Sequence, residues 1–199
     1  PLDTGRRTTL YPQLSLPLQT PAWHITPKLG LHSTRYDLDR RVSTGPDSVV
    51  RNLPSFSVDA GLAFERQFDW FGRNLTQTLE PRLYYLLVPQ RTQNNIPVFD
   101  SGLADFSFAT IFSDNIYSGV DRIADANQIT AALTSRLIDP QSGEEYLRGL
   151  VGQRYYFAKQ HVTLPGEPAR PGGASDFLAA LSGRLMPNTY MDTAWQYDP

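Results

Sequence analysis

Apolar side chains recur at every second position along most of this chain. In the clearest stretch, PSFSVDAGLAFE at residues 54–65, the even positions are apolar and the odd positions are polar or small. A period of two puts alternate side chains on opposite faces of an extended strand, whereas a helix requires a period near 3.6. The alternation predicts an all-β fold of about eight antiparallel strands. They are expected at residues 10–18, 23–34, 54–65, 76–87, 128–137, 147–157, 176–185 and 190–197.

The length of these segments and the distribution of charge within them favour a membrane barrel. Several segments are longer than the usual strand of about five or six residues and could cross a tilted bilayer. Almost all of their charge lies on one face, in the side chains of Asp59, Glu65, Glu80, Arg82, Arg136, Arg148 and Arg154. An apolar face toward lipid and a polar face toward a wet lumen are typical of an antiparallel transmembrane β-barrel. A soluble β-sandwich is the alternative, but its strands are expected to be shorter.

The predicted connections alternate between short and long. The short ones lie at residues 20–21, 69–74, 139–143 and 186–188, and the long ones at residues 37–49, 90–126 and 158–174. Bacterial outer-membrane barrels alternate tight periplasmic turns with longer extracellular loops in this way. Pro12, Pro27, Pro54 and Pro81 each lack a ladder donor, so we expect them near strand beginnings or at bulges.

Composition argues against several classes of function. The formal net charge of -2 argues against a nucleic-acid partner, and the absence of cysteine excludes a disulfide framework and a thiol nucleophile. His24 and His32 share a strand face but lie roughly 26 Å apart, so they cannot bind one metal ion. We expect neither a metal nor a cofactor. Because the chain starts at a proline and stops within an alternating segment, we expect residues 1–199 to be a single region of a larger barrel.

One polar stretch precedes a predicted strand. In YSGVDRIADANQIT, residues 117–130, the polar side chains are those of Asp121, Arg122, Asp125, Asn127 and Gln128. An acid-base site is one interpretation, but no histidine, serine nucleophile or metal-ligand set accompanies the cluster. We expect instead that these side chains pin the loop at residues 90–126 over the barrel mouth, because polar groups under such a cap need partners. A solvated loop end is the remaining alternative.

Three stretches of the chain resemble the barrel domain of the LptD family of lipopolysaccharide-assembly proteins. They are TLEPRLYYLLVPQRTQNNIPVFDSGLADF, YSGVDRIADANQITAALTSRLID and VGQRYYF. The most specific parts are DRI at residues 121–123, ANQ at 126–128 and LEPR at 79–82. The resemblance implies a large barrel in the bacterial outer membrane, plugged by the lipoprotein LptE, that exports lipopolysaccharide.

The resemblance favours a wall segment of the lipopolysaccharide translocon, without catalysis, in contact with lipopolysaccharide, LptE and outer-membrane lipids. A diffusion porin would show the same alternation without these motifs. A small eight-stranded outer-membrane enzyme would need a nucleophile set that the sequence does not show. The candidate lumen-facing residues are Glu80, Arg82, Arg136, Arg148 and Arg154. We expect their arginines to form ion pairs across the lumen or to contact the plug, and recognition of lipopolysaccharide phosphates is the alternative.

Overall fold

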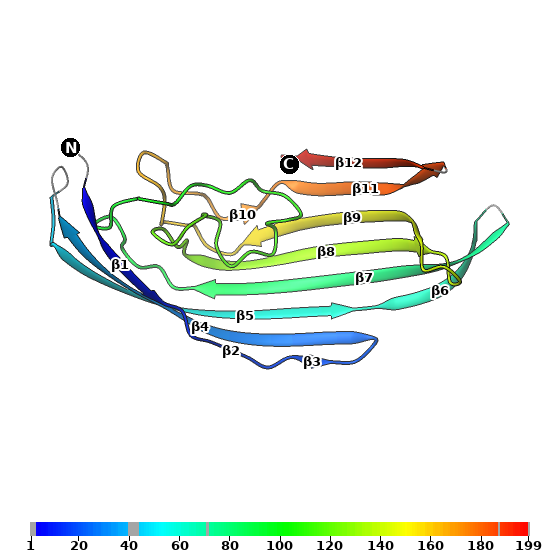
Figure 1. The fold of residues 1–199 in the computed structure, drawn as a ribbon, viewed down its shortest axis with the longest axis horizontal. Coiled ribbons are helices and arrows are strands. Elements are labelled where there is room, and N and C mark those ends of the chain that lie inside the picture. Colours follow the sequence, from blue (N-terminus) through cyan, green and yellow to red (C-terminus); the bar gives the residue numbers. More distant parts are fainter. Residues whose placement is uncertain (1–2, 40–43, 71, 187, 199) are drawn as a thin grey trace.

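The computed structural model describes residues 3–39, 44–70, 72–186 and 188–198, which form one antiparallel β-sheet (Figure 1). The strands are β1 (Thr4–Leu10), β2 (Gln13–Ser15), β3 (Leu18–Gln19), β4 (Trp23–Asp39), β5 (Ser48–Leu62), β6 (Phe64–Trp70), β7 (Arg73–Val88), β8 (Ala126–Ile138), β9 (Glu145–Tyr156), β10 (Gly173–Ala174), β11 (Phe177–Met186) and β12 (Thr189–Tyr197). None of the described segments is a helix long and apolar enough to cross a membrane. The prediction of an all-β fold is confirmed.

The strands lie across the sheet in the order in which they occur in the chain. The order is β1-β4-β5-β7-β8-β9-β11-β12, with β2 and β3 beside β4, β6 beside β7 and β10 beside β9. The path therefore has eight positions, as the alternation predicts. Among the described residues β1 and β12 pair with one neighbour each, so the sheet is an open, curved segment (Figure 1).

The two faces of the sheet differ in polarity. Exposed apolar side chains gather on one face, here called the outer face, and include Leu29, Leu31, Leu62, Leu79, Leu83, Leu133 and Val151. The strand register aligns these positions across neighbouring strands, as in the pairs Trp23↔Leu62 and Leu133↔Val151. The opposite face, here called the inner face, carries the charged residues of the predicted lumen side. The assignment of the two faces from the alternation is confirmed.

Three prolines lie where the sequence does not place them. Pro12 lies between β1 and β2, but Pro27, Pro54 and Pro81 lie within β4, β5 and β7 without a register shift. Each coincides with a gap in the ladder on one side. Pro27 lies beside the break between β2 and β3, Pro54 precedes the first pair of β5 with β7, and Pro81 lies opposite the junction of β5 and β6. A proline is tolerated there because its missing N–H is not needed by a neighbouring strand.

Short turns lie at one end of the sheet and long loops at the other (Figure 1). The turns after β3, β6, β8 and β11 lie at the right of the view, and the long connections after β7 and β9 lie at the left. The predicted alternation of connection lengths is therefore confirmed. The connection at residues 89–125, here called the inner loop, folds back over the inner face.

The inner loop contributes apolar side chains to two buried clusters. One cluster contains Leu53, Tyr84, Leu86, Val88, Ile123 and Ala126, and Phe112 packs against it. The other contains Tyr36, Leu38, Val49 and Ile96. Both combine strand residues with residues of the inner loop, so the hydrophobic core lies between the inner face and this loop. The burial stabilises the loop against the sheet because it removes apolar surface from water.

The polarity of the two faces predicts opposite responses to a charge. Leu83→Arg places a guanidinium at an exposed apolar position on the outer face of β7. In the membrane-embedded full-length protein we expect a loss of about 2 to 4 kcal/mol of folding free energy near the bilayer midplane. Thr134→Arg, on the inner face of β8 opposite Glu80, is the control and should be tolerated. Denaturant titration of the refolded barrel measures both, and equal losses would contradict the assignment of faces.

Candidate functional site

Asp121 is the most enclosed charged residue of the inner loop, with 0% of its surface exposed. Its Oδ1 atom accepts hydrogen bonds from Arg7 Nη1 at 2.7 Å and from the Tyr36 hydroxyl at 3.0 Å. Its Oδ2 atom accepts from the backbone N–H groups of Phe99 at 2.7 Å and Asp100 at 2.8 Å. A buried carboxylate requires such partners, because an unpaired one would cost several kcal/mol. The carboxylate thus joins β1 and β4 to the inner loop.

Arg51 of β5 holds the same part of the loop from the next strand. The side chain is buried, and its Nη1 atom donates to Gln93 Oε1 at 2.8 Å and to the Asp121 carbonyl oxygen at 2.7 Å. Its Nη2 atom donates to the Val120 carbonyl oxygen at 2.7 Å. Gln93 in turn donates to the Ile123 carbonyl oxygen at 2.7 Å. We call Arg7, Tyr36, Arg51, Gln93 and Asp121 the Asp121 anchor.

Arg122 has a different environment from its neighbour Asp121. Its guanidinium is buried, and Nη1 lies 3.5 Å from the Asp121 carbonyl oxygen. Burial lowers the pKa of Arg122, although an arginine remains charged at neutral pH. Its backbone is held by Ser101 Oγ, which accepts from the Arg122 N–H at 3.0 Å, and by Asn115, which donates to the Arg122 carbonyl oxygen at 2.8 Å. Arg122 therefore organises the loop internally.

Asp125 joins the inner loop to the second long loop. Its carboxylate accepts hydrogen bonds from the backbone N–H groups of His161 at 2.9 Å and Val162 at 2.8 Å. Gln160 donates to the Asp125 carbonyl oxygen at 2.9 Å, and the Tyr117 hydroxyl donates to the Val162 carbonyl oxygen at 3.0 Å. The two loops are therefore packed against each other by a buried polar contact.

Arg154 and Thr130 hold the deepest turn of the inner loop. Arg154 is 1% exposed on the inner face of β9 and donates to the Ile111 carbonyl oxygen. Thr130 of β8 donates to the same oxygen at 3.2 Å. The Arg154 guanidinium also lies 5.5 Å from the centre of the Phe106 ring. This predicted lumen arginine thus contacts the chain's own loop.

Two residues of the predicted cluster differ from the others. Asn127 pairs with Leu87, whose side chain is exposed on the outer face, and its Oδ1 atom accepts from the Tyr85 hydroxyl at 3.0 Å. The expectation that Asn127 pins the loop from the inner side is therefore wrong, because it lies one strand position after the inward-facing Ala126. Gln128 faces inward and is 1% exposed, and its Oε1 atom has no hydrogen-bond partner among the described residues.

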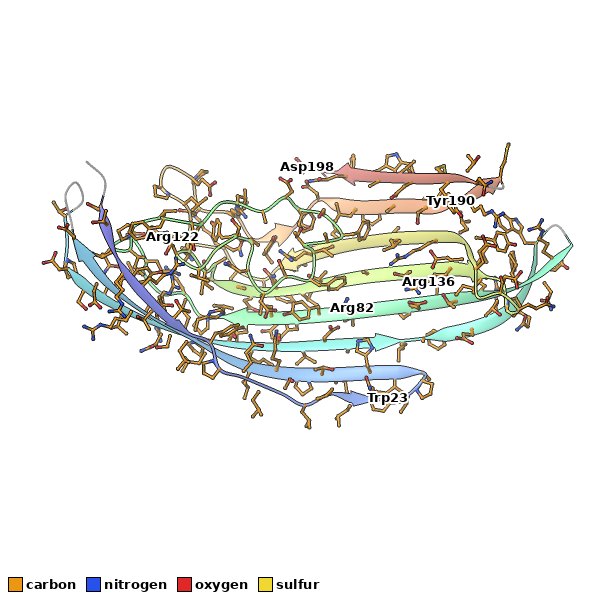
Figure 2. The ribbon with its side chains drawn as sticks, in the orientation of Figure 1. Trp23, Arg82, Arg122, Arg136, Tyr190 and Asp198 are labelled. Atoms are coloured by element: carbon orange, nitrogen blue, oxygen red, sulfur yellow. The ribbon has the colours of Figure 1, made fainter. Side chains whose placement is uncertain are left out.

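The remaining predicted lumen residues line a cavity of about 730 Å³ beside the inner loop. Arg82 forms two hydrogen bonds with Asp59, at 2.9 and 2.5 Å, and Arg136 Nη2 lies 3.2 Å from Glu80. Arg148 lies opposite Arg136 in the β8–β9 ladder, and in the described part of the chain it has no ion-pair partner. Figure 2 shows Arg82 and Arg136 along the middle and right of the sheet, and Arg122 in the crowded loop end. Ion pairs within the wall account for Arg82, Arg136 and Glu80.

The sequence did not single out Arg7, Tyr36 or Arg51. A signal was present for Arg51, because extending the alternation of residues 54–65 backward by two steps places it on the inner face with Leu53. The chain carries no such signal for Arg7, whose partners Asp100 and Asp121 are distant in sequence. The hydrogen bond from Arg7 holds the pKa of Asp100 well below its usual range.

The charged groups of this site are engaged in structural contacts. Among the described residues, no group of three His, Cys, Asp or Glu side chains is arranged to hold a metal ion. Asp121, Asp125 and Arg154 each bind backbone groups of the loops. The arrangement is suited to holding loops against a sheet, and the absence of catalysis stays a prediction.

The fold and the site together define a class of protein. Long antiparallel strands, an apolar outer face and long loops packed on a polar inner face are the features of a segment of a β-barrel wall. The family model described as LptD, LPS transport system D, matches residues 2–199. The chain belongs to the LptD family.

Relatives support this assignment over nearly the whole chain. "LPS-assembly protein LptD" of Aromatoleum aromaticum is 57% identical over 98% of the chain. The proteins of the same name from Azoarcus sp. and Bordetella pertussis are 55% and 47% identical, also over 98% of the chain. The chain spans about a quarter of the length of these relatives, at 25%, 24% and 26%.

The Asp121 anchor predicts coupling between two distant residues. Asp121→Ala strands the Arg7 guanidinium, and Arg7→Ala removes one of four hydrogen bonds to a buried carboxylate. In the full-length protein, either change should speed proteolytic cleavage within residues 90–116, because an unsatisfied buried group costs about 1 to 3 kcal/mol. The double variant should be less impaired than the sum of the single effects.

Arg35→Ala serves as the control for this cycle. Arg35 pairs with Asp37 at 3.1 Å in an exposed ion pair, and such pairs contribute little to stability. Cleavage of the inner loop should therefore keep its parental rate. Parental protection of the loop in both Asp121→Ala and Arg7→Ala would contradict the anchoring role of this pair.

Proposed function

We propose that this chain forms part of the wall of an outer-membrane barrel that assembles lipopolysaccharide at the cell surface. The observation that carries the proposal is the family match over residues 2–199, on a chain whose outer face is apolar along its strands. The relatives are named LPS-assembly proteins. Lipopolysaccharide is therefore the proposed substrate of the whole protein, and this chain contributes wall and loops.

The proposed role of the inner loop is to cap the lumen. Asp121 and Arg51 hold its outer part, and Arg154 and Thr130 hold the turn at residues 107–112 against the inner face. Phe108 and Phe112 of this turn line the cavity next to the wall arginines. A loop packed inside a large barrel narrows the opening and limits passage of other solutes.

The proposed partner is the lipoprotein LptE, which the family resemblance implies as a plug of the barrel. The inner face offers a mixed surface for such a partner. Around the cavity, Arg148 is a cation without an ion pair among the described residues, and Leu150 and Phe108 supply apolar contacts. A protein surface needs both, because apolar burial gives affinity and charged groups give orientation.

The sidedness of the wall is tested by labelling intact cells. We expect single cysteines at the exposed loop positions Asn94 and Pro168 of the full-length protein to react with a membrane-impermeant maleimide. A cysteine at Gln141, in the short turn after β8, should react only after the outer membrane is permeabilised. The two classes of position lie at opposite ends of the strands. Labelling of Gln141→Cys alone in intact cells would reverse the proposed orientation.

The partner is tested by photocrosslinking from the two faces. A photoreactive residue at Thr134, which lines the inner cavity, should capture LptE in cells. The same residue at Leu83, on the outer face of the neighbouring strand, should not, because that position faces lipid. Immunoblotting for LptE measures the adducts. Capture from Leu83 but not from Thr134 would contradict the proposal that the plug lies on the inner face.

A further inference from the structure

The inner loop contacts far more of the wall than the two strands it connects. It joins β7 to β8, yet its polar contacts reach β1 through Arg7, β4 through Tyr36 and β5 through Arg51. On the other side it reaches β9 through Arg154. The loop therefore crosses the inner face transversely to the strands.

Asp114 gives the clearest case of a bridge between strands that are not neighbours. Its Oδ2 atom accepts a hydrogen bond from Lys28 Nζ of β4 at 2.6 Å, and its Oδ1 atom accepts from the Tyr84 hydroxyl of β7. β5 lies between these two strands. Two residues away, the Phe112 ring packs 4.0 Å from the Arg82 guanidinium of β7.

We propose that the inner loop acts as a transverse strap that makes β1 to β9 one stiff plate within the barrel wall. Ladder hydrogen bonds set the spacing of neighbouring strands, but the angle between them varies widely, from about −10 to −35°. Changing that angle is therefore the soft motion of a sheet. A loop fixed to both ends of the plate opposes this motion, because bending would stretch buried, charge-assisted hydrogen bonds.

The plate ends at the boundary between β9 and β11. Among the described residues, the hydrogen bonds and ion pairs of the inner loop reach no residue of β11 or β12. The ladder across this boundary runs from Leu178↔Gly152 to Gly183↔Leu147 and also contains Gly149. Glycine within a strand weakens it, because it has no side chain to pack. Bending of the wall is therefore directed to this boundary. This inference concerns the mechanics of the wall and does not depend on the transported substrate.

The test measures distances between spin labels in the full-length protein in bilayers. Labels on encoded non-natural residues at Ile25 and Val151 report on the plate across roughly 20 Å, and labels at Ile25 and Trp195 also cross the boundary. All three positions are on the outer face and exposed. We expect a narrow distance distribution for the first pair and a broader one for the second.

A release variant and a matched control isolate the strap. Tyr36→Phe with Thr130→Val removes two hydroxyls that bind the inner loop and changes no charge. Ser33→Ala with Thr193→Val removes two hydroxyls that bind other strands. The release variant should broaden the Ile25–Val151 distribution, and the control should leave it at the parental width.

Two outcomes would overturn the proposal. One is an Ile25–Val151 width that the release variant leaves unchanged, and the other is equal broadening by the control variant. Heat-modifiable gel mobility confirms that each barrel is folded before measurement. If the release variant fails to fold, Tyr36→Phe alone, which removes one hydrogen bond from Asp121, takes its place with the same expected direction.

Discussion

Pairing of backbone N–H and C=O groups between neighbouring strands is the constraint on which this structure depends. A wall that crosses a lipid bilayer cannot leave these groups without partners, so each strand must follow its neighbour in register. Register in turn decides which side chains share a face, because a slip by one residue would move every side chain to the opposite face. The prolines show how strict the requirement is, since Pro27, Pro54 and Pro81 coincide with gaps in the ladder.

The inner loop adds a second level of order, which rests on buried charge. Asp121 is fully enclosed and is compensated by Arg7, while Arg51 binds the adjacent backbone. A buried pair of this kind contributes little net stability over an apolar contact of equal volume, but breaking it is costly. The network therefore favours one placement of the loop over others. The same contacts that close the proposed cap over the lumen also connect strands that are far apart in the sheet.

The polar stretch at residues 117–130 illustrates how far sequence reasoning reaches at such a site. Its position before a strand and its density of polar groups predict a pinned loop, and Asp121 and Asp125 are indeed buried among backbone donors. The partners could not be predicted. Arg7 and Asp121 are separated by 114 residues, and only the tertiary fold brings them together. Asn127 was misplaced because the start of the strand determines which face a residue occupies, and strand starts are poorly defined by periodicity.

The sequence by itself determined the fold class, the approximate strands, the two faces and the alternation of turns and loops. These properties follow from local rules: a period of two defines a strand, and its apolar half defines the lipid side. The tertiary structure decided which residues hold the inner loop, which arginines pair within the wall and which one remains without an ion pair. Those outcomes depend on distances between strands that are remote in the chain. They are set by curvature and packing, which no local pattern encodes.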